Sequence, residues 1–222
     1  MRYERMKKIF LIVLTILLIA GLSLSLFSCK TSALWRGQGN DTRDNNADVA
    51  EGNGSEKYIV YAALNSSGNL ITRPQSGDPE ATAEYAVVGY TGLVAELMIP
   101  SQYNGKNVTK VLVATPYDNY YCYRDVAANG APIDYTGDDA RLANNTVITS
   151  MVLGSNVSFV GAGVCVGMTN LTTLSFKRAS SVTVGANAFA ACSALRTVSF
   201  ACASADATLN GNFSGLTITY AS

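Results

Sequence analysis

Histidine is absent from the 222-residue sequence. Without it the chain cannot assemble a Ser-His-Asp or Cys-His catalytic group, and it lacks a principal ligand of zinc. The segment GVCVG, residues 163–167, has neither the length nor the lysine of a phosphate-binding loop. We therefore expect no catalytic residue, no metal site and no cofactor, and we expect a protein that is not an enzyme.

Charge is also scarce, above all in the C-terminal third. From Val147 onward the only charged residues are Lys177, Arg178, Arg196 and Asp206. Residues 1–28 hold four of the 16 basic and one of the 16 acidic residues, so 12 basic and 15 acidic residues remain beyond them. This balance leaves no excess of positive charge for binding nucleic acid. The acidic cluster Asp134, Asp138 and Asp139 lies in a glycine-containing turn, which favours a solvated loop over a catalytic acid pair.

The N-terminus has the pattern of an export signal. Lys7 and Lys8 precede an uncharged stretch from Ile9 to Phe27, which predicts a signal peptide or, by its length alone, an uncleaved membrane anchor. LFSC, residues 26–29, resembles the lipobox of bacterial lipoprotein signals. That resemblance implies cleavage after residue 28 and lipidation of Cys29, although an ordinary thiol after a signal peptide remains the alternative. Two or more acyl chains on Cys29 would anchor the exported protein stably to a bacterial membrane, in the outer membrane or at the cell surface.

Four cysteines remain besides Cys29, namely Cys122, Cys165, Cys192 and Cys202. Export permits disulfides. However, four cysteines are too few to act as the main scaffold of so long a chain, and two of them occur inside apolar runs. We therefore expect small buried hydrophobic side chains rather than a disulfide framework.

Composition divides the rest of the chain into four segments. Residues 29–57 are rich in Gly, Asn and Asp and predict a disordered tether. Residues 58–113 contain β-branched and aromatic runs separated by turn residues, which predicts a small β region that includes a first degenerate repeat. Residues 114–146 interrupt this pattern with prolines and tyrosines and predict an irregular insertion. Residues 147–222 contain the repeats.

The hexamer LTTLSF at residues 171–176 returns as LRTVSF at residues 195–200, an interval of 24 residues. Related segments are ITSMVL at residues 148–153 and the incomplete LTITY at residues 216–220. Self-similarity at this period, with Leu-x-x-Leu-x-Leu spacing, predicts a mainly β fold with a short leucine-rich-repeat solenoid of about four coils.

Alternation along the strands divides their side chains into two sets. Met151, Leu153, Leu174, Phe176, Val198, Phe200, Ile218 and Tyr220 are expected to stack inward, in layers that extend to Leu97 and Ile99. The outward set would form two parallel columns and contains the candidate ligand-facing residues Ser150, Val152, Thr173, Ser175, Thr197, Ser199, Thr217 and Thr219. On a solenoid strand these residues are also ordinary soluble β-formers, so the columns alone do not establish a binding site.

The repeat residues carry a resemblance to a known family. VGANAFAACSALRTVSF, residues 184–200, resembles the BspA-like leucine-rich repeats of bacterial surface proteins, as does NVSFVGAGVCVGMTNLTTLSF before it. YAVVGYTG and ELMIPSQYNGKNVTKV resemble the segment that often leads into such repeats, so the resemblance covers about residues 85–113 and 147–200. It implies a cell-surface lipoprotein that adheres to host proteins or neighbouring cells.

Four tyrosines occur within seven positions: Tyr117, Tyr120, Tyr121 and Tyr123. Tyrosine is enriched in protein interfaces, so these side chains are further candidates for ligand contact. The alternative is that they belong to one more strand and pack into the core.

Three other functions remain open. One alternative is a structural or self-associating envelope lipoprotein without a host ligand, because LTITY would leave an unpaired strand edge at the end of the solenoid. Regular TLS, TVS and TIT triplets also fit binding to ice or another crystal, although SMV interrupts that column. An enzyme is the least favoured reading of the sequence.

Overall fold

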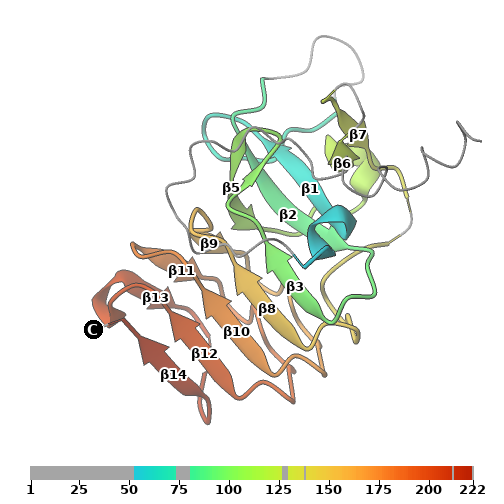
Figure 1. Ribbon diagram of the computed structural model, residues 1–222. Helices are drawn as coiled ribbons and strands as arrows, with labels where there is room; N and C mark the ends of the chain where they lie inside the picture. Colours follow the sequence, from blue (N-terminus) through green and yellow to red (C-terminus); the bar gives the residue numbers. More distant parts are fainter. Residues whose placement is uncertain (1–52, 74–80, 127–129, 138, 212, 222) are drawn as a thin grey trace, which may run out of the picture. The chain divides into compact units, whose positions relative to one another are not determined.

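The computed structural model describes residues 53–73, 81–126, 130–137, 139–211 and 213–221 (Figure 1). All of them belong to the larger of two compact units, Asn45–Ser222. The expected signal peptide at 1–28, the lipidation site Cys29 and the tether as far as residue 52 lie outside the described residues. These three expectations stay predictions.

Five short parallel strands form the front sheet of a β-solenoid, and Figure 1 shows them side by side. In spatial order they are β3 (Glu96–Ile99), β8 (Ser150–Leu153), β10 (Thr173–Phe176), β12 (Thr197–Phe200) and β14 (Thr217–Tyr220). Thr173 pairs with Ser150 and Thr197, and Thr197 pairs with Thr217. The solenoid and its period near 24 residues are thus confirmed.

A second sheet, called the back sheet here, returns the chain between the front strands. Its solenoid part is β5 (Lys106–Val111), β9 (Phe159–Val160), β11 (Val182–Val184) and β13 (Ala207–Leu209), all parallel. It continues through β2 (Glu84–Tyr90), β1 (Ile59–Leu64), β6 (Cys122–Val126) and β7 (Pro132–Asp134), with β4 (Gln102–Tyr103) attached to β5. Because β2 pairs in parallel with β5, the small β region and the solenoid share one sheet.

The number of turns is about five rather than the expected four. The additional turn comes from β3 and β5, which lie in the degenerate repeat expected within residues 58–113 and pair with β8 and β9. The helical elements of the described residues are three short 3-10 turns, η1 (Ser55–Tyr58), η2 (Tyr117–Asn119) and η3 (Ser204–Asp206). The fold is therefore mainly β, as the sequence predicts.

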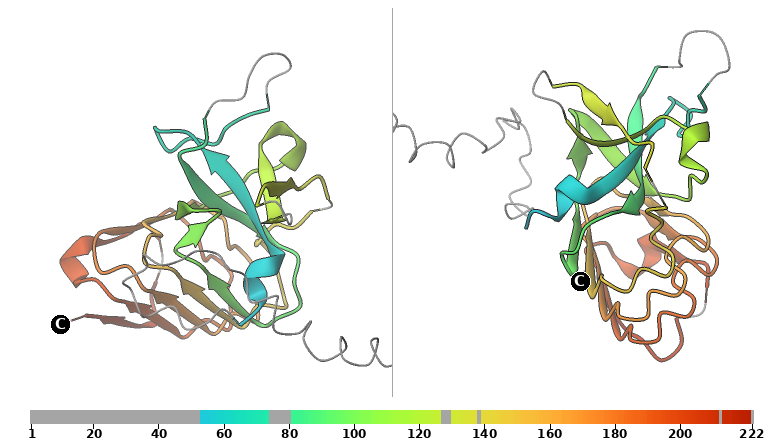
Figure 2. Two further views of the ribbon diagram at one scale, coloured as in Figure 1. Left: turned by 45° about the horizontal axis from the view of Figure 1, so that its top comes forward. Right: turned by 90° about the vertical axis from the view of Figure 1, so that its right-hand side faces the viewer.

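Inward side chains of the two sheets build the core between them. Along β8 and β12 the side chains alternate between half-buried and buried, which places Met151, Leu153, Val198 and Phe200 inside. The rings of Phe176 and Phe200 stack with centroids 4.6 Å apart, and Tyr220 follows at 5.4 Å. An aromatic column thus joins the coils of β10, β12 and β14, and the successive coils are seen one behind another in Figure 2.

Two expected segment boundaries differ from the structure. Residues 53–57 were assigned to the tether, but Asn53 and η1 pack on β3 and belong to the body. The insertion at 114–146 is not wholly irregular, because β6 pairs with β1 and β7 pairs with β6. Its turn-forming residues predict irregular structure, whereas β6 forms by pairing with β1, a strand that is distant in sequence.

The four cysteines of the body are free and buried, which confirms the expectation of small hydrophobic side chains. The thiol of Cys192 donates to the carbonyl oxygen of Cys165 at 3.1 Å. Burial raises the pKa of the Cys122 thiol to about 12 and raises that of Cys165 well above its usual range. Both groups therefore stay protonated at neutral pH.

These thiols should be almost unreactive in the folded protein, because only an accessible thiolate attacks disulfide reagents readily. In a Cys29→Ser chain at pH 8, we expect Ellman's reagent to modify none of the four within minutes under native conditions. All four should react in 6 M guanidinium chloride. Rapid native modification of any one of them, measured by absorbance and assigned by mass spectrometry, would contradict the buried placement.

Candidate functional site

The outward side chains of the front sheet form one surface, called the front face here. Its members stand in two columns: Glu96, Ser150, Thr173, Thr197 and Thr217 in the first, and Met98, Val152, Ser175, Ser199 and Thr219 in the second. Neighbouring rungs of a sheet lie about 4.8 Å apart. The expected outward residues are thus in register on one surface, and each is exposed or half-buried.

The front face is rich in hydroxyl groups and nearly without charge. Seven of its ten side chains are Ser or Thr, two are Val152 and Met98, and Glu96 at one end carries its only charge. A surface of this kind offers hydrogen-bond donors and acceptors at fixed spacing. Because it carries almost no charged groups, a partner that covers it pays little for the desolvation of ions. It can form hydrogen bonds and apolar contacts, and Glu96 is the one titratable side chain in these columns.

Glu96 and Met98 were missed as members of this face. The segment ELMI, residues 96–99, has the same alternation as SMVL at residues 150–153, so a comparison of the two segments would have found both. The structure brings them together because β3 and β8 are parallel neighbours although 50 residues separate their strands in the chain.

The four tyrosines do not join the front face. Tyr117 is only 6 % exposed, and its ring meets that of Tyr135 edge-on at 5.4 Å. Tyr117 was expected as a candidate ligand-facing residue; its burial in the core corrects that expectation. Tyr120 is half-buried against the same core cluster as Tyr117, while Tyr121 and Tyr123 pack against the larger cluster that includes the solenoid core.

Tyr121 is half-buried, and its ring contacts the side chain of Arg73. The guanidinium of Arg73 lies 4.9 Å from the centre of the Tyr121 ring and also pairs with Asp134 at 3.0 Å. The four tyrosines thus lie in or against the two core clusters, which is the core alternative left open by the sequence.

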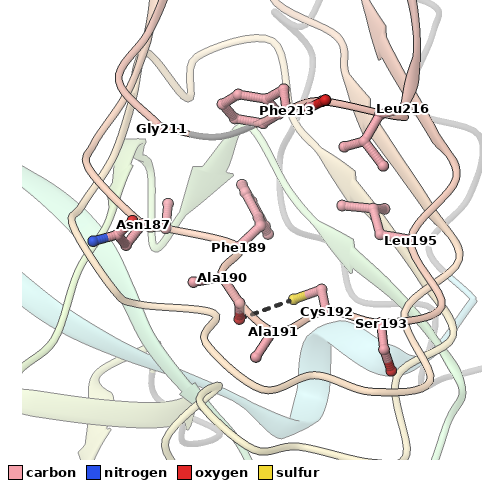
Figure 3. Close-up of a pocket in the computed structure, with 12 residues that line it drawn as sticks. Asn187, Phe189, Ala190, Ala191, Cys192, Ser193, Leu195, Gly211, Phe213 and Leu216 are labelled. Carbon is pink, nitrogen blue, oxygen red and sulfur yellow. Dashed lines mark hydrogen bonds between the residues drawn. The ribbon is translucent and has the colours of Figure 1, made fainter.

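A pocket lies at the C-terminal end of the solenoid (Figure 3). This terminal pocket has a volume of about 360 Å³, and its lining includes Asn187, Phe189, Cys192, Leu195, Phe213 and Leu216. Figure 3 shows the rings of Phe189 and Phe213 on one side and the side chains of Leu195 and Leu216 on the other. Its walls combine these apolar side chains with polar groups such as those of Asn187 and Ser193.

The terminal pocket exists because the last coil is short. The return from the back sheet to the front sheet comprises residues 161–172 in one coil and 185–196 in the next, but only 210–216 in the last. The longer returns stack closely: amides of Gly163, Cys165 and Gly167 donate to carbonyls of the following return at 3.1, 2.9 and 2.8 Å. The short return cannot cover residues 187–193 in the same way, so their side chains line a depression.

Within the described ranges, no helix has the length and apolar character needed to cross a bilayer. Among the same residues, no group of three or more His, Cys, Asp or Glu side chains is placed to hold a metal ion.

Comparison of the chain with protein-family models, with curated proteins and with solved structures gave no match. A proposal of function therefore depends on the geometry of the front face and on the resemblance noted in the repeat residues.

Proposed function

We propose that this is an exported, lipid-anchored, non-enzymatic protein of the bacterial cell surface that binds a protein or cell-surface ligand through its front face. The anchor would be lipid on Cys29, and the residues up to 52 would act as its tether. The bound partner would belong to a host surface or a neighbouring cell, as the resemblance to BspA-like repeats implies.

The register of the front face is the observation that carries this proposal. Thr173, Ser175, Thr197 and Ser199 occupy its centre and are aligned pair by pair across β10 and β12. A strand needs no such repetition of hydroxyl side chains on its solvent side merely to pack its core. Because the face is small, each contact would be weak, and many copies on one membrane would supply avidity.

Binding should be lost when the centre of the front face is made basic. Four lysines at Thr173, Ser175, Thr197 and Ser199 would block close approach and add uncompensated charge. We expect beads coated with this full-chain variant to bind epithelial cells, bacterial cells or matrix proteins at least about tenfold less than wild-type beads.

The matched control places four lysines on exposed turns away from the front face, at Ser180, Ser181, Ser204 and Ala205. This variant should bind as wild type does, which removes added charge as the cause. Thermal unfolding of both variants checks that they remain folded. Equal binding by the front-face variant and wild type would rule out the proposed surface.

A second experiment tests location separately. Protease treatment of intact cells that express the full chain should remove the body, detected with an antibody against residues 58–222. Survival of the body on intact cells, with digestion after lysis, would place it inside the envelope and exclude adhesion.

A further inference from the structure

The two ends of the front sheet are finished differently. At β3 the chain covers its own edge: the amide of Met98 donates to Ser55 Oγ at 3.0 Å, and Asn53 Nδ2 donates to the carbonyl of Glu96 at 2.8 Å. At the other end, β14 pairs with β12 alone, and none of the described residues pairs with its outer edge. An uncovered edge of this kind presents a row of backbone donors and acceptors to another strand.

The outer edge of β14 consists of the backbone groups of its even-numbered residues. The amides of Thr217 and Ala221 donate to Arg196 and Phe200 of the β12 side at 2.8 and 3.0 Å. Backbone groups alternate in direction along a strand. The N–H and C=O groups of Ile218 and Tyr220 therefore point away from β12, toward the open edge.

The polarity of the side chains along this edge is symmetric about its central residue. From Leu216 to Tyr220 they alternate apolar, hydroxyl, apolar, hydroxyl, apolar, with Ile218 at the centre. Antiparallel pairing of two such strands about Ile218 places apolar residues opposite apolar residues on the core side. On the other side it places Thr217 of each copy opposite Thr219 of its partner copy.

We propose that two copies of this chain associate through β14, antiparallel and centred on Ile218, and so join two front sheets into one. The pairing of Ile218 with Ile218 of the second copy is of the hydrogen-bonded type, since both N–H and C=O groups of this residue point outward. The interface is isologous and closes as a two-fold dimer.

The apolar surface at this end fits the same arrangement. Tyr220 ends the aromatic column and is 36 % exposed, whereas Phe200 before it is 4 % exposed. In the two-fold pair, Tyr220 of each copy lies opposite Leu216 of the other, at the rim of the terminal pocket. Each copy thus covers the exposed ring and the pocket rim of the other with apolar surface.

Charge does not oppose this contact. Asp206 is the only charged residue after Arg196, and it lies in η3, before the back strand β13 rather than in β14. The back-sheet edge at β13 is a poorer candidate, because that strand has three residues and no comparable symmetry. A second copy of the chain is therefore the partner we infer, because the side chains of its own β14 match those of this edge in polarity along the whole strand.

Two double variants distinguish this geometry from other contacts. Thr217 and Thr219 are both exposed in the single chain, so charged side chains there are tolerated. In Thr217→Lys/Thr219→Glu, antiparallel pairing sets each Lys opposite a Glu of the other copy. In Thr217→Lys/Thr219→Lys, it sets Lys opposite Lys at the closely spaced, non-hydrogen-bonded positions.

We expect sedimentation equilibrium of the wild-type full chain to show a monomer–dimer equilibrium at protein concentrations between about 1 and 500 μM, a range that suits micromolar contacts. The Lys/Glu variant should dimerise roughly fivefold more tightly than wild type, and the Lys/Lys variant should remain monomeric throughout. A Lys/Lys variant and a Glu/Glu variant should form a mixed dimer when combined.

A wild-type chain that is monomeric at every concentration, or dimers of equal strength in the Lys/Glu and Lys/Lys variants, would overturn the proposal. Dimers formed only by a lipidated sample would indicate lipid clustering instead and would also overturn it. The proposed ligand face is tested at Thr173, Ser175, Thr197 and Ser199, so failure of either idea is recognised independently of the other.

Discussion

Replacement of Phe176 by alanine should lower the free energy of unfolding by about 3–5 kcal/mol. Phe176 is 1 % exposed and its ring stacks on Phe200 at 4.6 Å. The substitution removes most of a buried aromatic side chain from the inner end of the aromatic column, between Leu153 and Phe200. Neighbouring coils cannot collapse into the space because hydrogen bonds fix their separation. Such a loss is a large fraction of the roughly 5–15 kcal/mol that stabilises a typical domain.

Urea titration of the full chain, followed by circular dichroism, measures this effect. The matched control is Tyr220→Ala at the end of the same column, tested at a low protein concentration so that dimer formation does not contribute. Because that ring is 36 % exposed, the loss should stay below about 1.5 kcal/mol. Equal losses at Phe176 and Tyr220 would mean that the inner end of the column is not more buried than its outer end.

A single methyl group at Gly185 should also be costly. A Cβ atom there would lie 2.6 Å from the amide nitrogen of Ala162 and 2.9 Å from the carbonyl carbon of Gly161. These are backbone atoms of the preceding coil, so no side chain can rotate away to make room. We expect Gly185→Ala to destabilise the protein by about 3 kcal/mol, at the upper end of overpacking effects.

Two other glycines provide a graded comparison. At Gly161, the corresponding position one coil earlier, a Cβ would meet the carbonyl oxygen of Val111 at 3.2 Å, and at Gly211 the nearest atom would be 3.5 Å away. The losses measured by urea titration should therefore decrease from Gly185→Ala to Gly161→Ala and become small for Gly211→Ala. The reverse order would contradict the close stacking of the back-to-front returns at residues 161–172 and 185–196.

The repeat and its register were readable from the sequence because each coil must cover the same kind of apolar face. Residues such as Leu174 and Val198 recur with a period that is set by the contour length of one coil, and the structure pairs them directly. The outward hydroxyl set followed from the two-residue period of a strand. The buried, unpaired cysteines followed from their apolar surroundings.

Other features depended on contacts between distant segments. The sequence extended the inward layers to Leu97 and Ile99, but the pairing of β3 with β8 added Glu96 and Met98 to the front face. The segment β6 proved to be a strand because β1 offers it an edge. Tyr117 is also buried by a contact between distant segments. Its hydroxyl donates at 3.3 Å to the carbonyl oxygen of Val88, which lies 29 positions earlier in the chain. Local composition contains no record of such partners.

The sequence by itself thus determined a mainly β solenoid, its period and which side chains of each repeat face the core, because stacking imposes these on every coil alike. Only the tertiary structure decided how the two ends of the stack are covered. Asn53 and Ser55 close the edge at β3, whereas none of the described residues pairs with the outer edge of β14, and the short return 210–216 leaves the terminal pocket beside it. The ends differ from the middle because a terminal coil has a neighbour on one side only, so its covering must come from a distant segment or from another molecule.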